Sequence, residues 1–227
     1  IILNAKINDL EINKININYN NKIFTDIDID IENNNESLIK KVNIGLGAKH
    51  PETRDDNTVS IQGKIDNLSF SDWANLTTTS NTKENNLDKE KTISGKISVK
   101  NLEIINKNFN DTNINFTNSK INEDWNIIFD GDEIKGIARY TKRSKNKNDY
   151  LYADFENLSL NRNNNIENIT SYDISKIPEL KINIENFIYK NNELGNLNLS
   201  TSRKVKNIIN IDELNFKKPG LNINASG

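Results

Sequence analysis

The stretch Asp26-Ile27-Asp28-Ile29-Asp30-Ile31-Glu32 alternates apolar and acidic residues without exception. Successive side chains of a β-strand point to opposite faces, so this stretch predicts a strand with isoleucines on one face and carboxylates on the other. Similar alternation recurs at residues 10–12, 15–19, 42–46, 59–61, 97–99, 182–184, 197–199 and 221–223. The sequence therefore predicts a mainly β protein whose sheet has one apolar face to cover.

Composition narrows the classes of function. The 227 residues carry a formal net charge of -2, which provides no charge excess for binding nucleic acid or an anionic membrane surface. Cysteine is absent, so these residues hold no disulfide and no thiolate metal site. No apolar run approaches the roughly 18 residues of a membrane helix. Methionine is also absent, and we expect the chain to be one segment of a longer protein that contacts membranes only through other regions.

A short pattern recurs within the predicted strands. Residues 60–65 (Ser-Ile-Gln-Gly-Lys-Ile) resemble residues 92–97 (Thr-Ile-Ser-Gly-Lys-Ile), and residues 133–137 echo both. An Asn-Leu pair follows the first two copies, at Asn67 and Asn101, and recurs at Asn157. Glycine inside a strand usually marks a bulge or a bend. We therefore predict bent strands, repeated irregularly along an elongated sheet, and leave the register between strands open at Gly63 and Gly95, where a bulge would switch it.

A few short helices are also expected. Residues 71–76 have Ser71 as a candidate helix cap, and residues 173–176 precede Pro178. Polar segments at 33–35, 51–57, 77–91, 142–149 and 161–165 are expected to be loops.

Candidate catalytic and metal-binding groups are sparse. The carboxylates at alternate positions of the opening stretch lie nearly 7 Å apart in a strand, too far to share one calcium ion, so a solvated strand face explains them better. His50 is the only histidine, and no Gly-X-Ser-X-Gly elbow accompanies it. The Gly-Leu-Gly at 45–47 lacks the third glycine of a dinucleotide fingerprint. We expect no enzyme activity, no cofactor and no metal.

Three arrangements would cover the apolar face. A second sheet gives a sandwich, closure gives a barrel, and a curved open sheet leaves a groove for an apolar ligand. Aromatic residues make up only 7% of the chain, with 9 Gly and 3 Pro, whereas isoleucine is abundant. This composition favours a long, smooth apolar lining, that is, the open groove. Trp73 and Trp125 are expected to anchor the core or to close one end of the apolar face.

Several segments resemble, in order, sequence elements of the YhdP branch of the AsmA-like superfamily. Their shared feature is a set of Gly, Trp, Pro and Leu residues at characteristic spacings. Ile174 stands where the family usually has a proline. The segments are Gly63–Trp73, Trp125–Gly131 with Ile134–Ile137, Asp173–Leu180, Glu193–Leu197 and Pro219–Gly227, so the resemblance covers about residues 55–227.

The resemblance implies a large protein anchored in the inner membrane of a Gram-negative envelope. Its periplasmic part would be a long curved β-sheet with a hydrophobic groove, and it would carry phospholipid toward the outer membrane. Residues 1–227 would form one segment of that repetitive β-groove domain, flanked by neighbouring segments of the same chain. The expected fold is thus an elongated, curved, mainly antiparallel sheet that forms an open hydrophobic groove, and the expected function is a non-enzymatic lipid conduit.

The alternation predicts which residues line the groove and contact phospholipid acyl chains. Their neighbours Asp28, Asp30, Asn183 and Asn198 are expected to face water. The predicted lining residues are Ile27, Ile29, Ile31, Ile61, Ile65, Ile97, Val99, Ile182, Ile184, Leu197, Leu199 and Ile223.

Two alternatives remain open at the level of sequence. Abundant asparagine is compatible with an Asn ladder in a β-helical surface adhesin or structural envelope protein. A β-helix requires strands at a fixed period, and the spacing here is irregular. A β-sandwich binding module would instead require a closed core.

Overall fold

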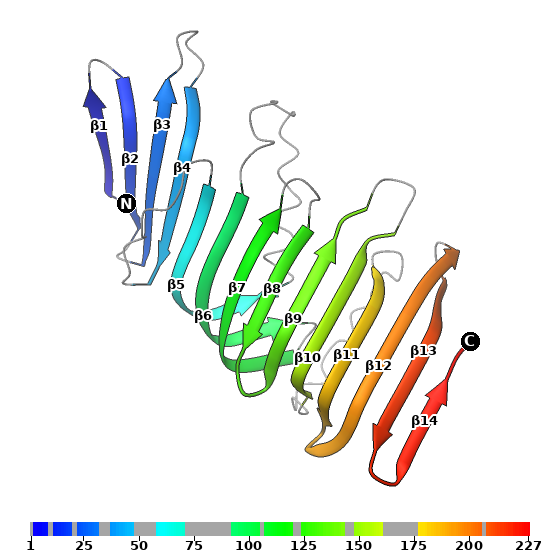
Figure 1. The fold of residues 1–227 in the computed structure, drawn as a ribbon. Coiled ribbons are helices and arrows are strands. Elements are labelled where there is room, and N and C mark those ends of the chain that lie inside the picture. The colour runs from blue at the N-terminus through cyan, green and yellow to red at the C-terminus, as the bar shows by residue number, and fades with distance from the viewer. Residues whose placement is uncertain are drawn as a thin grey trace.

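The computed structural model describes residues 2–8, 11–19, 22–31, 37–47, 58–70, 92–104, 107–119, 124–143, 148–160, 177–205 and 208–227. In this part of the chain fourteen strands form a single sheet, shown in Figure 1. Their bounds are β1 (Ile2–Asn8), β2 (Glu11–Tyr19), β3 (Ile23–Ile31), β4 (Ser37–Leu46), β5 (Thr58–Ser69), β6 (Thr92–Ile104), β7 (Lys107–Ser119), β8 (Asp124–Asp130), β9 (Ile134–Thr141), β10 (Tyr150–Leu160), β11 (Glu179–Tyr189), β12 (Asn192–Val205), β13 (Ile208–Lys218) and β14 (Leu221–Ala225).

The strands lie side by side in the order of the sequence, from β1 at one edge to β14 at the other. Ten neighbouring pairs are antiparallel. The pairs β4–β5, β5–β6 and β10–β11 are parallel. Fourteen strands at a spacing of about 4.8 Å give the sheet a length of about 60 Å. The prediction of an elongated, mainly antiparallel open sheet is confirmed, and the predicted helices at 71–76 and 173–176 lie outside the described residues.

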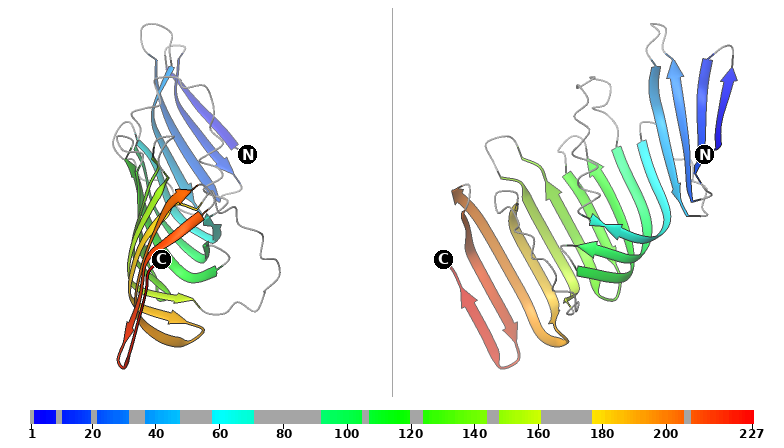
Figure 2. Two further views of the ribbon diagram at one scale, coloured as in Figure 1. Left: turned by 90° about the vertical axis from the view of Figure 1, so that its right-hand side faces the viewer. Right: turned by 180° about the vertical axis from the view of Figure 1, so that it is seen from behind.

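The sheet is strongly curved, as the side view in Figure 2 shows. Several neighbouring strands bend at positions that lie opposite one another in the sheet, and these bends produce the curvature. In β6, both Val99 and Leu102 are buried, at 1% and 0% exposure, although residues three apart in a regular strand face opposite sides. The intervening Lys100 is omitted from the ladder with β5 and with β7. The opposite positions Asp66 and Asp111 are omitted with it, without a register shift, so the three strands bend together and apolar residues on both sides of the bend reach the same core.

The same bend occurs in four other strands. Each has two polar residues, one of them asparagine, between two apolar or buried residues. In β7, Asp111 occupies the bend with a φ of 45°. The bend segments are 65–68 in β5, 99–102 in β6, 109–112 in β7, 155–158 in β10 and 184–187 in β11.

Asparagine side chains join the strands along the bend. Asn101 donates a hydrogen bond from Nδ2 to Oδ1 of Asn67 on β5, at 3.0 Å. The backbone N–H and Nδ2 of Asn110 on β7 donate to Oε2 of Glu133, at 2.9 and 3.2 Å. Nδ2 of Asn157 on β10 donates to the carbonyl of Asp132, at 2.6 Å. The recurring Asn-Leu pair thus has a structural explanation, because asparagine satisfies backbone and side-chain groups where the strands turn.

The glycines of the first two copies do not introduce the bulge that the sequence left open. The β5–β6 ladder continues without a shift through Gly63 and Gly95. Gly63 is instead needed for close packing, because a Cβ placed there would lie 2.0 Å from the carbonyl oxygen of Leu46, and its φ is +138°. The register shift next to the third copy lies on the partner strand, between Phe155 and Asn157 opposite Gly136.

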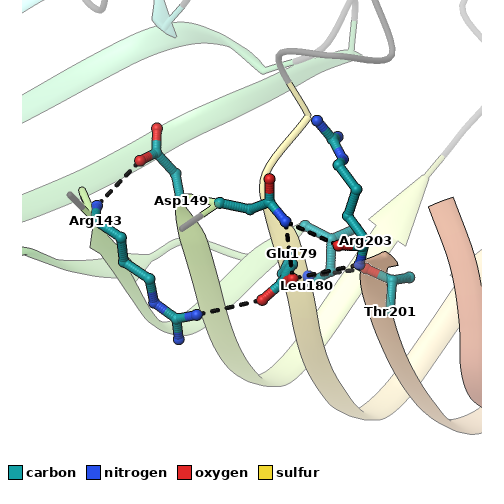
Figure 3. A network of polar contacts seen from close by, with 7 residues as sticks. Arg143, Asp149, Glu179, Leu180, Thr201 and Arg203 are labelled. Atoms are coloured by element: carbon teal, nitrogen blue, oxygen red, sulfur yellow. Dashed lines mark hydrogen bonds and ion pairs between the residues drawn. The ribbon is translucent and has the colours of Figure 1, made fainter. Parts of the chain in front are cut away.

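A polar network holds the upstream ends of β10 and β11 together (Figure 3). The carboxylate of Glu179 accepts hydrogen bonds from Nη1 of Arg143 at 3.3 Å, Nδ2 of Asn148 at 3.1 Å and the backbone N–H of Arg203 at 3.3 Å. Asp149 accepts from the Tyr140 hydroxyl at 2.5 Å. Burial and this bond raise the pKa of the Tyr140 phenol, so it stays a neutral donor at physiological pH.

We expect Glu179→Ala to destabilise the fold by about 2 kcal/mol, since it removes one acceptor from three donors that are partly buried. Glu156→Ala is the control, because the Glu156 side chain is 62% exposed and makes only a surface ion pair with Lys135. The measurement is the urea midpoint of each variant. Equal midpoints for the two variants would contradict a stabilising role for the network.

Candidate functional site

Two rows of apolar positions cross the sheet on one face, perpendicular to the strands. Residues that are paired across neighbouring strands share a face, so the ladder registers define each row. We call the two rows together the apolar strip. The first row, from β2 to β14, is Tyr19, Ile23, Leu46, Gly63, Ile97, Ile114, Phe129, Gly136, Phe155, Ile184, Leu197, Phe216 and Ile223. The second, from β1 to β14, is Leu3, Ile17, Thr25, Ile44, Ile61, Gly95, Phe116, Ile127, Ala138, Ala153, Ile182, Leu199, Leu214 and Ala225.

Ten of the twelve predicted lining residues lie on this one face. Seven of them belong to the strip itself, and Ile27, Ile65 and Val99 extend it at neighbouring positions of β3, β5 and β6. Ile29 and Ile31 follow Ile27 at alternate positions of β3, where only the backbone is described. Their contact with acyl chains remains a prediction. The seven members of the strip are Ile61, Ile97, Ile182, Ile184, Leu197, Leu199 and Ile223.

On the opposite face, strands β11 to β14 carry a row of asparagines. Asn183 on β11 pairs with Asn198 on β12, and Asn198 with Asn215 on β13, which in turn pairs with Asn224 on β14. These four positions form an asparagine row on the outside of an open sheet. Asn183 and Asn198 are half-buried. Asp28 and Asp30 are described only by their backbone.

Exposure along the strip is uneven. Ile23 near one end is 39% exposed and Ile223 at the other end is 46% exposed, whereas Ile97 and Ile184 between them are 0% and 3% exposed. The strand bends contribute to this burial, because residues beyond the bends, such as Leu102 and Phe187, belong to the same core cluster as the strip. The strip is therefore accessible to water at its ends and covered in its middle.

Aromatic rings cover the gaps that glycines leave in the strip. A Cβ at Gly95 would lie 2.3 Å from Cζ of Phe116, so this ring occupies the space above the glycine. Phe129 and Phe155 flank Gly136 in the first row, with ring centroids 6.2 Å apart. The predicted lining residues are all aliphatic and include none of these rings. Their signal was present, since each phenylalanine occupies an apolar position of the alternation.

Trp125 packs beside the strip rather than within it. Its ring centroid lies 6.2 Å from that of Phe116, and the residue packs against the core cluster. This agrees with the predicted role as a core anchor. Trp73 and His50 lie outside the described residues.

A recess of about 740 Å³ is lined by residues of β3 to β7 and by Lys22 and Gly47 beside them. Its lining includes charged residues and residues of both faces, because Lys64, Ser98 and Asn113 alternate with strip-face residues in their strands. The lining residues are Lys22, Ile23, Leu46, Gly47, Lys64, Ile65, Asp66, Ser98, Val99, Lys100, Asp111 and Asn113.

No metal centre is found among the described residues. No group of three or more His, Asp or Glu side chains is placed to hold an ion in that part of the chain. Asp26, at the start of the acidic stretch, accepts a hydrogen bond from Nδ2 of Asn16 on β2. This carboxylate therefore has a partner within the sheet.

A comparison with protein-family models identifies the chain. The model described as "YhdP protein" matches residues 1–227, that is, the whole length. The chain belongs to the YhdP family. The match extends the assignment to residues 1–54, where the sequence shows strand alternation but no diagnostic motif. Comparisons with curated proteins and with solved structures gave no match.

Among the described residues, no helix is both long and apolar enough to cross a bilayer.

The single open sheet differs from both alternative folds that the sequence had left open, because a β-helix coils its strands and a sandwich packs two sheets.

Proposed function

We propose that this YhdP-family chain is a non-enzymatic segment of a phospholipid conduit, located in the periplasm of a Gram-negative bacterium. Acyl chains would contact the apolar strip, and headgroups would remain in water beyond it. The observation that supports this proposal best is the continuity of the strip. Neither row contains a charged residue, and both cross nearly the whole sheet.

The direction of the strip matters for transport. The rows run perpendicular to the strands and so follow the long axis of the sheet, over about 60 Å. Where the strip is accessible, at its two ends, an acyl chain that moves along a row would exchange one apolar contact for another, with no charged residue of either row to cross. Each methylene removed from water contributes about 0.8 kcal/mol. Many weak, similar contacts hold a lipid without trapping it at one position.

Neighbouring segments of the same protein would continue the conduit. The edge strands β1 and β14 have an unpaired side in the described sheet, and both rows of the strip reach β14. A strand added at that edge with the same alternation would extend the apolar face. No catalytic group is required for such a role.

Ile223, at the β14 end of the strip, allows a test of lipid binding. We expect Ile223→Asp to reduce the phospholipid that co-purifies with the 227-residue chain several-fold, because a carboxylate there would have to lose water for acyl chains to pass. The protein should remain folded, since Ile223 is 46% exposed. Lipid is measured by mass spectrometry of extracts from the purified chain.

Asn224→Asp is the matched control, because this exposed residue is adjacent to Ile223 in β14 and points to the opposite face. It should retain the wild-type amount of lipid. Equal lipid in both variants, at equal thermal stability, would count against the strip as the lipid-binding surface.

A further inference from the structure

A third row of side chains lies on the same face as the apolar strip, on the side of the strip that faces the polar network of Glu179. It runs from Ile15 on β2 to Ile211 on β13, and no member of it carries a charge. Between β6 and β11 each member lies two residues from a member of the strip in its own strand, so alternation places both on one face. These members are Ile93, Asn118, Trp125, Tyr140, Leu151 and Leu180.

The third row is partly exposed where the strip is covered. In β9 and β10 the strip residues Ala138 and Ala153 are 9% and 2% exposed. The third-row residues of the same two strands, Tyr140 and Leu151, are half-buried, and so are the other members between β6 and β11. The third row therefore continues an uncharged, partly exposed surface across the middle of the sheet, between the two accessible ends of the strip.

The polarity of the sheet face changes at the third row. Beyond it, the Tyr140 hydroxyl donates to Asp149 at 2.5 Å, and the backbone N–H of Leu180 donates to Oγ1 of Thr201 at 2.9 Å beside the Glu179 network (Figure 3). Tyr140 and Trp125 each combine an apolar ring with a polar O–H or N–H group, and such side chains are favoured where apolar surface meets water. The row is thus bordered by the strip on one side and by hydrogen-bonding groups on the other.

The third row suits a ligand that needs no hydrogen bonds along its length. From β6 to β10 each member of the row is paired with a residue of the strand on either side. A polypeptide that binds by strand addition needs a free sheet edge, and these strands offer none at this level. A hydrocarbon chain needs only apolar contact, and a polar group at one end of it would reach the network.

We propose that the third row carries phospholipid acyl chains across the covered middle of the sheet, with the ester and headgroup on the side of the Glu179 network. The inference rests on the proposed function and specifies its path. Acyl chains contact the strip at its two ends, and the third row joins these ends. Successive contacts along the row are separated by the strand spacing of about 4.8 Å.

The test maps contacts with a photoreactive lipid. The purified 227-residue chain is incubated with vesicles of dioleoyl phosphatidylcholine that contain a phosphatidylcholine with a diazirine in the middle of one acyl chain. Cross-linked residues are identified by mass spectrometry of peptides after irradiation. We expect cross-links at Trp125 and Leu151 as well as at Ile223, and about tenfold fewer at Ala138 and Ala153, because insertion requires contact with the chain.

Leu151→Glu places a carboxylate in the third row, which acyl chains must then pass. Tyr152→Glu is the matched control, because Tyr152 is adjacent to Leu151 in β10 and lies on the opposite face. Leu151→Glu should lower cross-linking at Trp125 about tenfold and leave Ile223 unchanged, whereas Tyr152→Glu should leave both unchanged. Circular dichroism establishes that each variant is folded. The wild-type map is independent of these variants and decides the proposal by itself if Leu151→Glu does not fold.

The other outcomes separate the inference from the proposed function. Cross-links at Ile23 and Ile223 with none in the third row, or equal cross-linking at Trp125 in the two folded variants, would overturn the inference and leave the conduit proposal intact. Cross-links at Ala138 that equal those at Leu151 would assign the path to the strip instead. A third row that is shielded only in a dimer, as sedimentation would reveal, would be a contact between two copies of the chain. Absence of cross-links from the whole face would overturn the conduit proposal and the inference with it.

Discussion

Ile97→Asp is expected to destabilise the sheet by about 4 kcal/mol or more. Ile97 is 0% exposed at the centre of the core cluster, and the substitution removes a large aliphatic group while it buries a carboxylate without a partner. In a chain of marginal stability this loss approaches complete unfolding. The measurement is urea denaturation followed by circular dichroism.

Lys96→Asp is the matched control for this substitution. Lys96 is exposed, adjacent to Ile97 in β6, and on the opposite face, where its cross-strand neighbours Gln62 and Asn115 are uncharged. We expect a loss below about 1 kcal/mol, the range of strand propensities. Comparable losses of stability for the two variants would contradict the assignment of Ile97 to the buried face of β6 and of Lys96 to its exposed face.

Gly63→Ala is expected to cost about 3 kcal/mol or more and to separate the end of β4 from β5. The new Cβ would lie 2.0 Å from the carbonyl oxygen and 2.7 Å from the carbonyl carbon of Leu46, and these are backbone atoms that cannot rotate away. The φ of +138° adds strain, because side chains with L chirality rarely adopt it. Amide hydrogen exchange should accelerate in residues 42–46 before it does so in the rest of the sheet.

Gly220→Ala separates the effect of φ from the effect of the contact. Gly220 has a φ of +79° in the turn between β13 and β14, and nothing lies within 4 Å of its would-be Cβ. We expect a loss of about 1 kcal/mol, the conformational cost alone. If Gly63→Ala were no more destabilising than Gly220→Ala, the close approach to Leu46 would not be a constraint on the fold.

The alternation of side chains predicted the strand faces well, because it is a property of each strand by itself. It placed Ile61, Ile97, Ile184 and Leu197 on one face without any knowledge of pairing. The order of the strands and the three parallel pairs depend on long connections, which alternation does not specify. The bends were harder to predict for a related reason. Val99 and Leu102 break the period of two, and only the fold shows that both face the core.

The recess was not predictable from local pattern. It requires that β4 stop at the level of Gly63 while β5 continues, so that Lys22 and Lys100, which lie far apart in the sequence, come to line one site. Each lysine taken alone resembles any other exposed lysine of the chain. The lysines come together only because β4 ends before β5 does, and side-chain alternation does not specify where one strand ends relative to its neighbour.

The sequential order of the strands has a consequence for how the chain folds. Each strand pairs only with the strands that adjoin it in sequence, so the sheet behaves as a nearly one-dimensional array whose stability is a sum of nearest-neighbour terms. The hairpins close short connections, whereas the parallel pairs β5–β6 and β10–β11 join residues 34 and 29 positions apart, so the hairpins should form faster than these parallel pairs. Folding can begin at any hairpin and continue as neighbouring strands pair with it one after another. Loss of structure should begin at β1 and β14 and reach the β6–β7 hairpin last.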